Sequence, residues 1–208
     1  MNDPQYNPAP ANWADLVRQK IYYDPDPVTG IDRSLRQYLF TVSYGRALLE
    51  ADVLGVVNVG ACDINAAIEA GGNAHLYETV GLIFTGGPHG CTGWAFWDSV
   101  FPFNPPRPTN ALRNWFRVNM DEPVGTWAME ALHCLTGFGD LYQTTNHPGG
   151  FDEMACACGT HPSSFTKLKL NWLDPSAVAR TRVGSPSSFE LHALANLQPL
   201  YRTRLSGQ

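Results

Sequence analysis

The sequence predicts a single α+β domain with long irregular loops. Segments with a helical pattern and segments with a strand pattern alternate along the chain, and stretches rich in Gly, Pro and aromatic residues separate them. The length of 208 residues suits one domain, or one domain with a small appendage. Hydrophobic residues make up 44% of the chain and charged residues only 16%. A sizeable core with few solvated helix faces is therefore expected.

The chain is predicted to have three regions. Residues 1–31 should form an extended N-terminal arm, because five prolines block long regular structure there, although residues 13–21 could form one helix. Residues 32–175 should form the main domain, and residues 176–208 a C-terminal extension. Within the extension, apolar and polar residues alternate at 188–194, which predicts one short strand.

Periodic apolar residues predict the regular elements of the main domain. A helix should begin after Asp32 and end before Gly45, because four apolar residues recur at helical spacing between them. The apolar run 80–85 is closed by Gly-Gly-Pro and predicts a central strand. The other expected segments are a buried strand at 54–59, helices at 64–70, 122–136 and 162–172, and loops at 88–110 and 139–160.

The charge balance bears on the class of partner. The net charge of −5 and the pI near 5.6 argue against nucleic acid or an anionic membrane surface. No apolar run approaches the roughly 18 residues that span a bilayer. The polar, Pro-rich residues 1–12 do not have the pattern of a signal peptide, and the sequence leaves the compartment open.

The cysteine pattern does not define a disulfide scaffold, because the count is odd and low for this length. The five cysteines are Cys62, Cys91, Cys134, Cys156 and Cys158. We expect Cys156 and Cys158 to be too tightly spaced for an ordinary bridge to each other. Three alternatives remain: small buried thiols, one or two bridges from Cys134 or Cys91 to this pair, and a second metal site.

One predicted helix carries the residues that point to chemistry. Met129 and His133 are four positions apart, so their side chains stack on one face of the helix. In the HExxH pattern both positions are histidines that bind one zinc ion, and the Glu after the first is the general base for the zinc-bound water. Here Glu130 and His133 stand at the expected places, and Met129 replaces the first histidine. Taken alone, a surface Glu and a core His at this spacing also occur by chance.

The surrounding segments resemble the metallopeptidases typified by immune inhibitor A, over roughly residues 24–175. Six motifs follow one another in the order of that family. They are the pre-catalytic helix and turn at 34–38 and 42–46, the strand at 80–84, Trp94-Ala95, the Phe-Asp-Glu-Met segment at 151–154, and the helix that follows Gly159. The resemblance implies a zincin-like fold, in which a twisted mixed β-sheet packs against the active-site helix and Met154 forms an apolar floor under the metal.

The resemblance also implies a set of site residues. It implies peptide-bond hydrolysis by a metal-activated water, with Glu130 as the general base and zinc as the cofactor. His133 and Asp140 would be zinc ligands, and His161 is a further candidate, with a helix cap as its alternative role. Asp140 lies seven residues after His133, one more than the compact family pattern has.

Other residues have smaller roles in this interpretation. Tyr142 and Trp94 are candidate substrate-binding residues, with simple packing as the alternative for Tyr142, and the peptide would lie along the edge strand of the sheet. His89 and His147 are loop residues that could replace a missing ligand. His75 and His192 are expected to be structural.

Met129 separates two functional hypotheses. A thioether is a poor ligand for Zn²⁺, so losing one imidazole should weaken zinc binding severely. The first hypothesis is a degenerate metallopeptidase, which the retained Glu130 favours. The alternative is a protease fold kept as a non-catalytic module for protein binding or assembly, which Met129 favours. In either case the expected partner is a peptide or protein, and the resemblance suggests an extracellular location. Without a metal, we expect His133 to hydrogen-bond Glu130 or Asp140.

Overall fold

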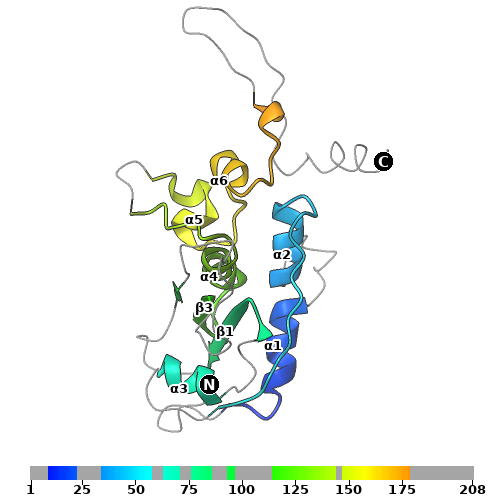
Figure 1. Cartoon of the computed structure of the whole chain (residues 1–208), viewed down its shortest axis with the longest axis vertical. Helices are drawn as coiled ribbons and strands as arrows, with labels where there is room; N and C mark the ends of the chain where they lie inside the picture. The colour runs from blue at the N-terminus through cyan, green and yellow to red at the C-terminus, as the bar shows by residue number, and fades with distance from the viewer. Residues whose placement is uncertain are drawn as a thin grey trace, which may run out of the picture.

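The structure is a computed structural model that describes residues 9–22, 34–57, 63–70, 76–85, 93–96, 114–143 and 147–178. These residues form helices and a small sheet (Figure 1). The α-helices are α1 (Trp13–Tyr22), α2 (Leu35–Val42), α3 (Ile64–Ala70), α4 (Val124–Thr136), α5 (Glu153–Cys156) and α6 (Ser164–Lys169). The strands are β1 (Thr79–Phe84), β2 (Trp94–Phe96) and β3 (Asn114–Asn119), and η3 (Gly149–Phe151) and η4 (Pro175–Ala177) are 3-10 turns. No helix of the described residues is long and apolar enough to cross a membrane.

The sheet has the order β1-β3-β2, with β3 in the middle. β3 is parallel to β1 and antiparallel to β2, so the sheet is mixed. Five of the six side chains of β3 are buried, and Arg117 is the partly exposed one. The strand predicted at 80–85 is found as β1, but at an edge of the described sheet rather than at its centre. β2 lies inside the segment 88–110 that was predicted to be a loop, and β3 lies in a segment for which no strand was predicted.

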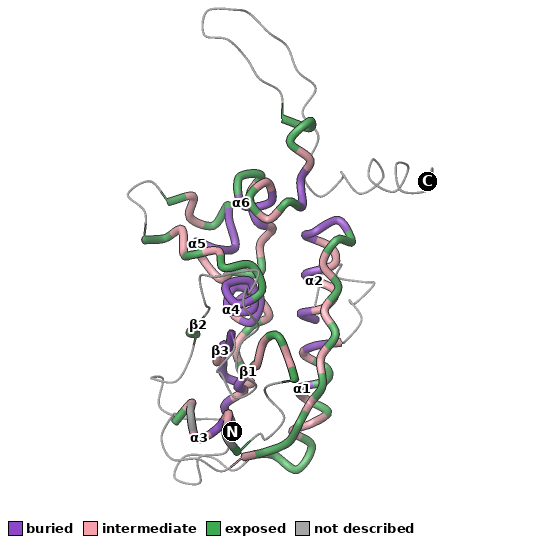
Figure 2. The backbone as a smooth tube through the Cα atoms, viewed as in Figure 1, coloured by how far each residue is buried: buried purple, intermediate pink, exposed green. Residues whose placement is uncertain are grey.

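Helix α4 packs against this sheet and forms the centre of the molecule (Figure 2). Nine of its 13 residues are buried, because apolar side chains occupy most of its circumference. The indole of Trp127 donates a hydrogen bond to the carbonyl of Asn119 at 3.0 Å, which ties the helix to the end of β3. Gly137 ends the helix in the left-handed conformation, with φ of 66°. The predicted helix 122–136 is therefore confirmed, with its first turn beginning after Pro123.

Helices α1 and α2 are in contact, with α2 above α1 in the view of Figure 1, and α2 also contacts α4. Val17 and Ile21 of α1 belong to the same hydrophobic core as Leu35 and Leu39 of α2. The helix expected near residues 13–21 is thus present. It is part of the core, however, so the prediction of an extended arm is wrong for this segment.

Two other predicted segments differ from the structure. Residues 54–57 form no strand, and Leu54 is half exposed, so the buried strand expected at 54–59 is wrong for these residues. The helix expected at 64–70 is found as α3. The strand expected at 188–194 lies outside the described residues.

The segment 139–160 is not a plain loop, because it contains α5. Asp152 caps α5 by accepting a hydrogen bond from the Met154 amide at 3.0 Å. The same buried carboxylate accepts hydrogen bonds from the Ser163 amide and the Thr166 hydroxyl, and so it joins α5 to α6. Ser163 caps α6, so this helix begins later than the predicted range 162–172.

Cys156 and Cys158 are joined by a disulfide, contrary to the expectation from their spacing. Ala157 adopts the left-handed conformation (φ 51°) between them, which reverses the chain, and the two Cα atoms are 5.2 Å apart. Cys134 is a free, buried thiol, so it does not bridge to this pair. Cys62 and Cys91 lie outside the described residues.

Candidate active site

The candidate site lies where α4 ends and the chain turns back on itself. Glu130 and His133 project from α4 and are 7% and 3% exposed. After Gly137 the chain reverses and brings Asp140 to the helix. His133 Nε2 and Asp140 Oδ1 are 3.0 Å apart. The contact expected between His133 and either Glu130 or Asp140 is therefore found with Asp140.

The hydrogen bond at the second ring nitrogen of His133, Nδ1, determines how His133 and Asp140 can interact. His133 Nδ1 lies 2.6 Å from the carbonyl oxygen of Phe138. A carbonyl can only accept, so Nδ1 carries a proton, and a neutral ring would then present a lone pair at Nε2. Asp140 Oδ1 also presents lone pairs, and it is buried with no hydrogen bond among the described residues. The two atoms therefore meet as an ion pair with a protonated ring, or they share a cation.

The loop that carries Asp140 is held from two directions. Asp140 Oδ2 accepts a hydrogen bond from the side-chain amide of Gln143 at 3.1 Å. The Leu141 amide donates to the carbonyl of Met154 at 2.8 Å, which ties the loop to α5. Partial burial and a hydrogen bond to Asp140 raise the pKa of Tyr142 to about 12. Tyr142 is therefore at the site, with half of its surface exposed.

Glu130 lies in the least polar part of the site. Burial, followed by the nearby carboxylates of Asp140 and Glu122, raises its pKa to about 8, although the charge of Arg117 opposes this shift. Most Glu130 side chains are thus protonated at neutral pH in this environment. A protonated carboxyl group donates a hydrogen bond and cannot take a proton from water.

Strand β2 forms the other wall of the site. A Cβ atom built on Gly93 would lie 3.5 Å from Glu130 Oε1, so the backbone that leads into β2 passes close to this carboxyl group. Trp94 follows, and it is 53% exposed. Its ring packs edge-on against Trp115, with 5.4 Å between the ring centres. The guanidinium carbon of Arg117 lies 5.1 Å from the centre of the Trp94 ring.

Met129 and Met154 both lie inside the main hydrophobic core. Met154 is fully buried and comes from α5, which contacts α4. Met154 therefore belongs to an element that packs against the site helix. The role of Met154 as a floor beneath a metal stays a prediction.

His161 does not join the other candidate ligands. No group of three or more His, Cys, Asp or Glu in the described part of the chain could hold a metal ion. His161 does not cap α6 either, because Ser163 does. Its Nδ1 is buried without a hydrogen bond among the described residues, and burial followed by the charge of Lys167 lowers its pKa.

The remaining histidines give no further ligand in the described residues. His147 is exposed and accepts a hydrogen bond from the Gly149 amide at 3.2 Å. The other replacement candidate, His89, and the two histidines expected to be structural, His75 and His192, lie outside the described residues.

The donors found among the described residues do not complete a catalytic zinc site. Catalytic zinc takes three protein ligands, and the described residues supply two, His133 and Asp140. Their separation of 3.0 Å is close to the edge of a zinc tetrahedron, roughly 3.4 Å. The place of the third ligand in the motif is occupied by Met129, whose side chain is part of the core. We therefore derive no reaction step through a metal.

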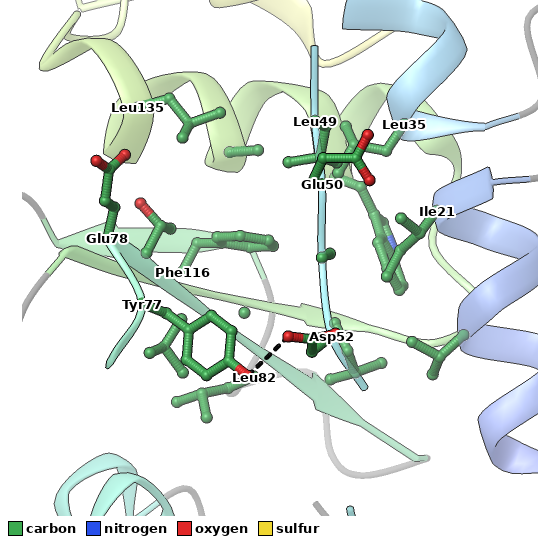
Figure 3. Close-up of a pocket in the computed structure, with 18 of the residues that line it drawn as sticks. Ile21, Leu35, Leu49, Glu50, Asp52, Tyr77, Glu78, Leu82, Phe116 and Leu135 are labelled. Carbon is green, nitrogen blue, oxygen red and sulfur yellow. Dashed lines mark hydrogen bonds between the residues drawn. The ribbon is translucent and has the colours of Figure 1, made fainter. Parts of the chain in front are cut away.

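An apolar cavity lies on the side of α4 that faces away from the candidate site (Figure 3). This cavity of about 950 Å³ is lined by α1, α2, residues 46–57, β1 and one face of α4. Most of its lining is apolar, and the Tyr77 hydroxyl donates to Asp52 across it at 2.8 Å. Trp127, Ala131 and Leu135 of α4 face the cavity, whereas the site residues do not line it.

Two residues of the site have no counterpart in the sequence interpretation. Gly93 approaches Glu130 from the segment that leads into β2, whereas Arg117 acts on Glu130 from β3, which packs against α4. The one available signal was a single basic residue among the aromatic and apolar residues of 114–119.

No protein-family model, curated protein or solved structure matches this chain. The metallopeptidase interpretation therefore rests on the sequence motifs and on the geometry of the site.

Proposed function

We propose that this chain is a degenerate metallopeptidase-like domain that binds an extended peptide or protein segment beside α4 without hydrolysing it. The observation that carries the proposal is the contact between His133 and Asp140 at 3.0 Å. Two groups that would be zinc ligands in the related enzymes are here paired with each other. The resemblance supplies the type of domain, and this pairing supplies the reason for the missing activity.

Strand β2 and its neighbours support the binding function. β2 is an antiparallel strand at the edge of the described sheet, a position at which an extended peptide can add as a further strand. Trp94 and Tyr142 are each about half exposed beside the buried Glu130, and exposed aromatic side chains are common anchors for peptides. The site thus offers backbone and aromatic contacts without a reactive centre.

The state of Glu130 supports the absence of hydrolysis. With its pKa near 8, Glu130 is mostly protonated at pH 7 and is a poor acceptor for the proton of an attacking water. The described donor set also lacks the third zinc ligand. The alternative function, peptide-bond hydrolysis, is favoured by the retention of Glu130 itself.

A binding assay with a fluorescently labelled casein, an unfolded protein that many peptidases cleave, tests the proposal. We expect casein to bind without being cleaved, and Trp94→Ala to weaken binding by about fivefold or more, since truncating a central aromatic anchor costs over 1 kcal/mol. The matched control is Leu76→Ala, which also removes an exposed apolar side chain but belongs to the cavity side of the molecule. Cleavage that Glu130→Gln abolishes would establish the alternative, and absence of binding would refute both functions.

A further inference from the structure

The disulfide between Cys156 and Cys158 joins residues that are already close neighbours along the chain. The two cysteines are separated by Ala157 alone. The stabilisation that a disulfide gives by restricting the unfolded chain grows with the length of the loop it closes. A bridge across one residue therefore restricts the unfolded chain very little, so stapling the fold does not explain its presence.

The bridge is accessible from solvent. Cys158 is exposed and Cys156 is partly exposed. By contrast, Cys134 is 2% exposed, and burial raises the pKa of its thiol. A thiolate in solution can thus reach the sulfur of Cys158 without any unfolding, whereas it cannot reach Cys134.

The backbone at the bridge favours its opening. Ala157 has φ of 51°, a left-handed conformation that is unfavourable for a residue with a Cβ atom. Its amide caps α5 through the carbonyl of Glu153. The turn also packs backbone to backbone against Gly125, so it lies at the first turn of α4. The oxidised bridge is one of the constraints that keep Ala157 in this conformation, and reduction removes it.

We propose that Cys156 and Cys158 form a thiol–disulfide exchange site whose co-reactant is a dithiol. A thiolate of the dithiol attacks Cys158 Sγ and forms a mixed disulfide. The bond between the cysteines breaks, and its electron pair leaves on Cys156 Sγ, which takes a proton from water. The Thr160 hydroxyl lies 3.8 Å from that sulfur and can donate to the new thiolate.

The second step of the exchange releases the dithiol from the protein as a disulfide. The remaining thiolate of the dithiol attacks its own sulfur in the mixed disulfide and releases Cys158 as a thiolate, which is then protonated. The dithiol leaves as a disulfide, having given two electrons to the protein. In the reverse direction the reduced pair is oxidised by a disulfide and returns to the bridge.

The test is the rate at which dithiothreitol reduces the bridge, followed by alkylation and mass spectrometry. For an exchange site we expect the rates in native buffer and in denaturing urea to agree within about tenfold, because attack needs no unfolding. Cys134 should stay unalkylated in native buffer, and oxidised glutathione should restore the bridge. A purely structural bridge would be reduced at least about a hundredfold more slowly in native buffer than in urea, and that result would overturn the proposal.

Two variants separate the roles of the cysteines. Cys156→Ser should leave Cys158 able to form a stable mixed disulfide with glutathione, because no neighbouring thiol can release it. The matched control Cys134→Ser should leave the exchange unchanged. If both Cys156 and Cys158 are found as thiols in air-oxidised, folded protein and glutathione disulfide does not join them, the proposal is wrong.

Discussion

His133 shows how burial and local contacts together determine the chemistry of a residue. Its ring is fixed by the Phe138 carbonyl at one nitrogen and by Asp140 at the other. In metal sites the same contact to a carbonyl orients a histidine ligand. The arrangement around His133 is thus that of a metal ligand, and the carboxylate of Asp140 lies 3.0 Å from its other ring nitrogen.

Glu130 gives the first prediction, because its pKa differs between the folded and unfolded chain. The folded protein keeps the proton up to about pH 8, whereas the unfolded chain releases it near pH 4.5. Between these values the unfolded state binds fewer protons, so the free energy of unfolding falls as pH rises. Glu130→Gln cannot ionise, so its stability relative to the wild type should increase between pH 4.5 and pH 8 by about 3 to 5 kcal/mol.

Urea unfolding of both proteins at several pH values measures this difference. Glu50→Gln serves as the control, since Glu50 is an exposed carboxylate paired with Arg36, and its difference from the wild type should stay small at every pH. Parallel pH profiles for Glu130→Gln and the wild type would show that Glu130 ionises normally in the folded protein.

The sequence identified the residues of the site that follow one another along the chain. Glu130 and His133 could be predicted because helical spacing puts them together, and Asp140 because it follows the end of the same helix. Gly93 and Arg117 could not, because they come near Glu130 only when the sheet packs against α4 in the folded protein. The disulfide could not be predicted because an alanine in the sequence gives no sign that this residue adopts the left-handed conformation.

Among the elements, α4 depends on a close approach of backbone to backbone in its first turn. A Cβ atom on Gly125 would lie 2.2 Å from the Gly159 amide nitrogen and 2.5 Å from the Ala157 carbonyl oxygen. Neither atom belongs to a flexible side chain, so the turn after α5 would have to move. This contact explains a glycine inside a helix, where glycine is otherwise unfavourable.

The substitution Gly125→Ala has two opposing effects: alanine has the higher helix propensity, but its Cβ atom clashes with the turn after α5. The propensity gain of about 1 kcal/mol should be outweighed by the clash, with a net loss of stability of about 1 to 3 kcal/mol. Gly139→Ala is the control, because a Cβ there meets no atom within 4 Å. Urea denaturation followed by circular dichroism measures both variants. A stabilised Gly125→Ala protein would mean that α4 and the turn after α5 are not in contact.

Asp152 connects α5 to α6 and gives a second prediction for elements. Its buried carboxylate accepts hydrogen bonds from the Met154 and Ser163 amides and from the Thr166 hydroxyl. Burial lowers the pKa of the fully buried Lys167 to about 8, although the charge of Asp152 opposes this shift. Asp152→Ala leaves these three donors without their acceptor and removes a favourable charge near Lys167, so it should cost about 3 kcal/mol or more.

The control for this substitution is Asp174→Ala, which removes a similar cap at an exposed turn. Asp174 accepts a hydrogen bond from the Ser176 amide at 2.8 Å, and its loss should cost about 1 kcal/mol. Equal losses of unfolding free energy in the two variants, measured by urea unfolding, would contradict the role of Asp152 in joining α5 to α6.

The helices were easier to predict than the strands. The spacing of apolar residues located α2, α3 and α4, because the signal of a helix is contained in its own sequence. β2 has three residues and lies in a segment rich in Gly and aromatic residues, so it has no period to detect. Adjacent residues of β3 are buried as well as alternate ones, so its sequence lacks the alternation of apolar and polar residues that indicates a strand. The segment 54–57 was misassigned because its apolar sequence suggests a buried strand, whereas Leu54 and Val56 are exposed in the structure.

On the scale of the whole molecule, α4 separates two different surfaces. One face carries Glu130 and His133 toward β2 and the Asp140 loop, and the other faces the apolar cavity (Figure 3). The mixed sheet against a buried helix is the arrangement that the resemblance implied, while the zincin fold itself stays a prediction. The central claim is that a metallopeptidase-like site has lost its metal through one residue, Met129.

Zinc titration of the wild type and of Met129→His by calorimetry tests this claim most directly. Met129→Leu is the control, because it keeps the apolar volume without adding a ligand. We predict that Met129→His binds zinc at least about a hundredfold more tightly than the wild type and Met129→Leu, since it supplies a third ligand beside His133 and Asp140. Wild-type protein that binds zinc as tightly as Met129→His, or a variant that binds none, would contradict it.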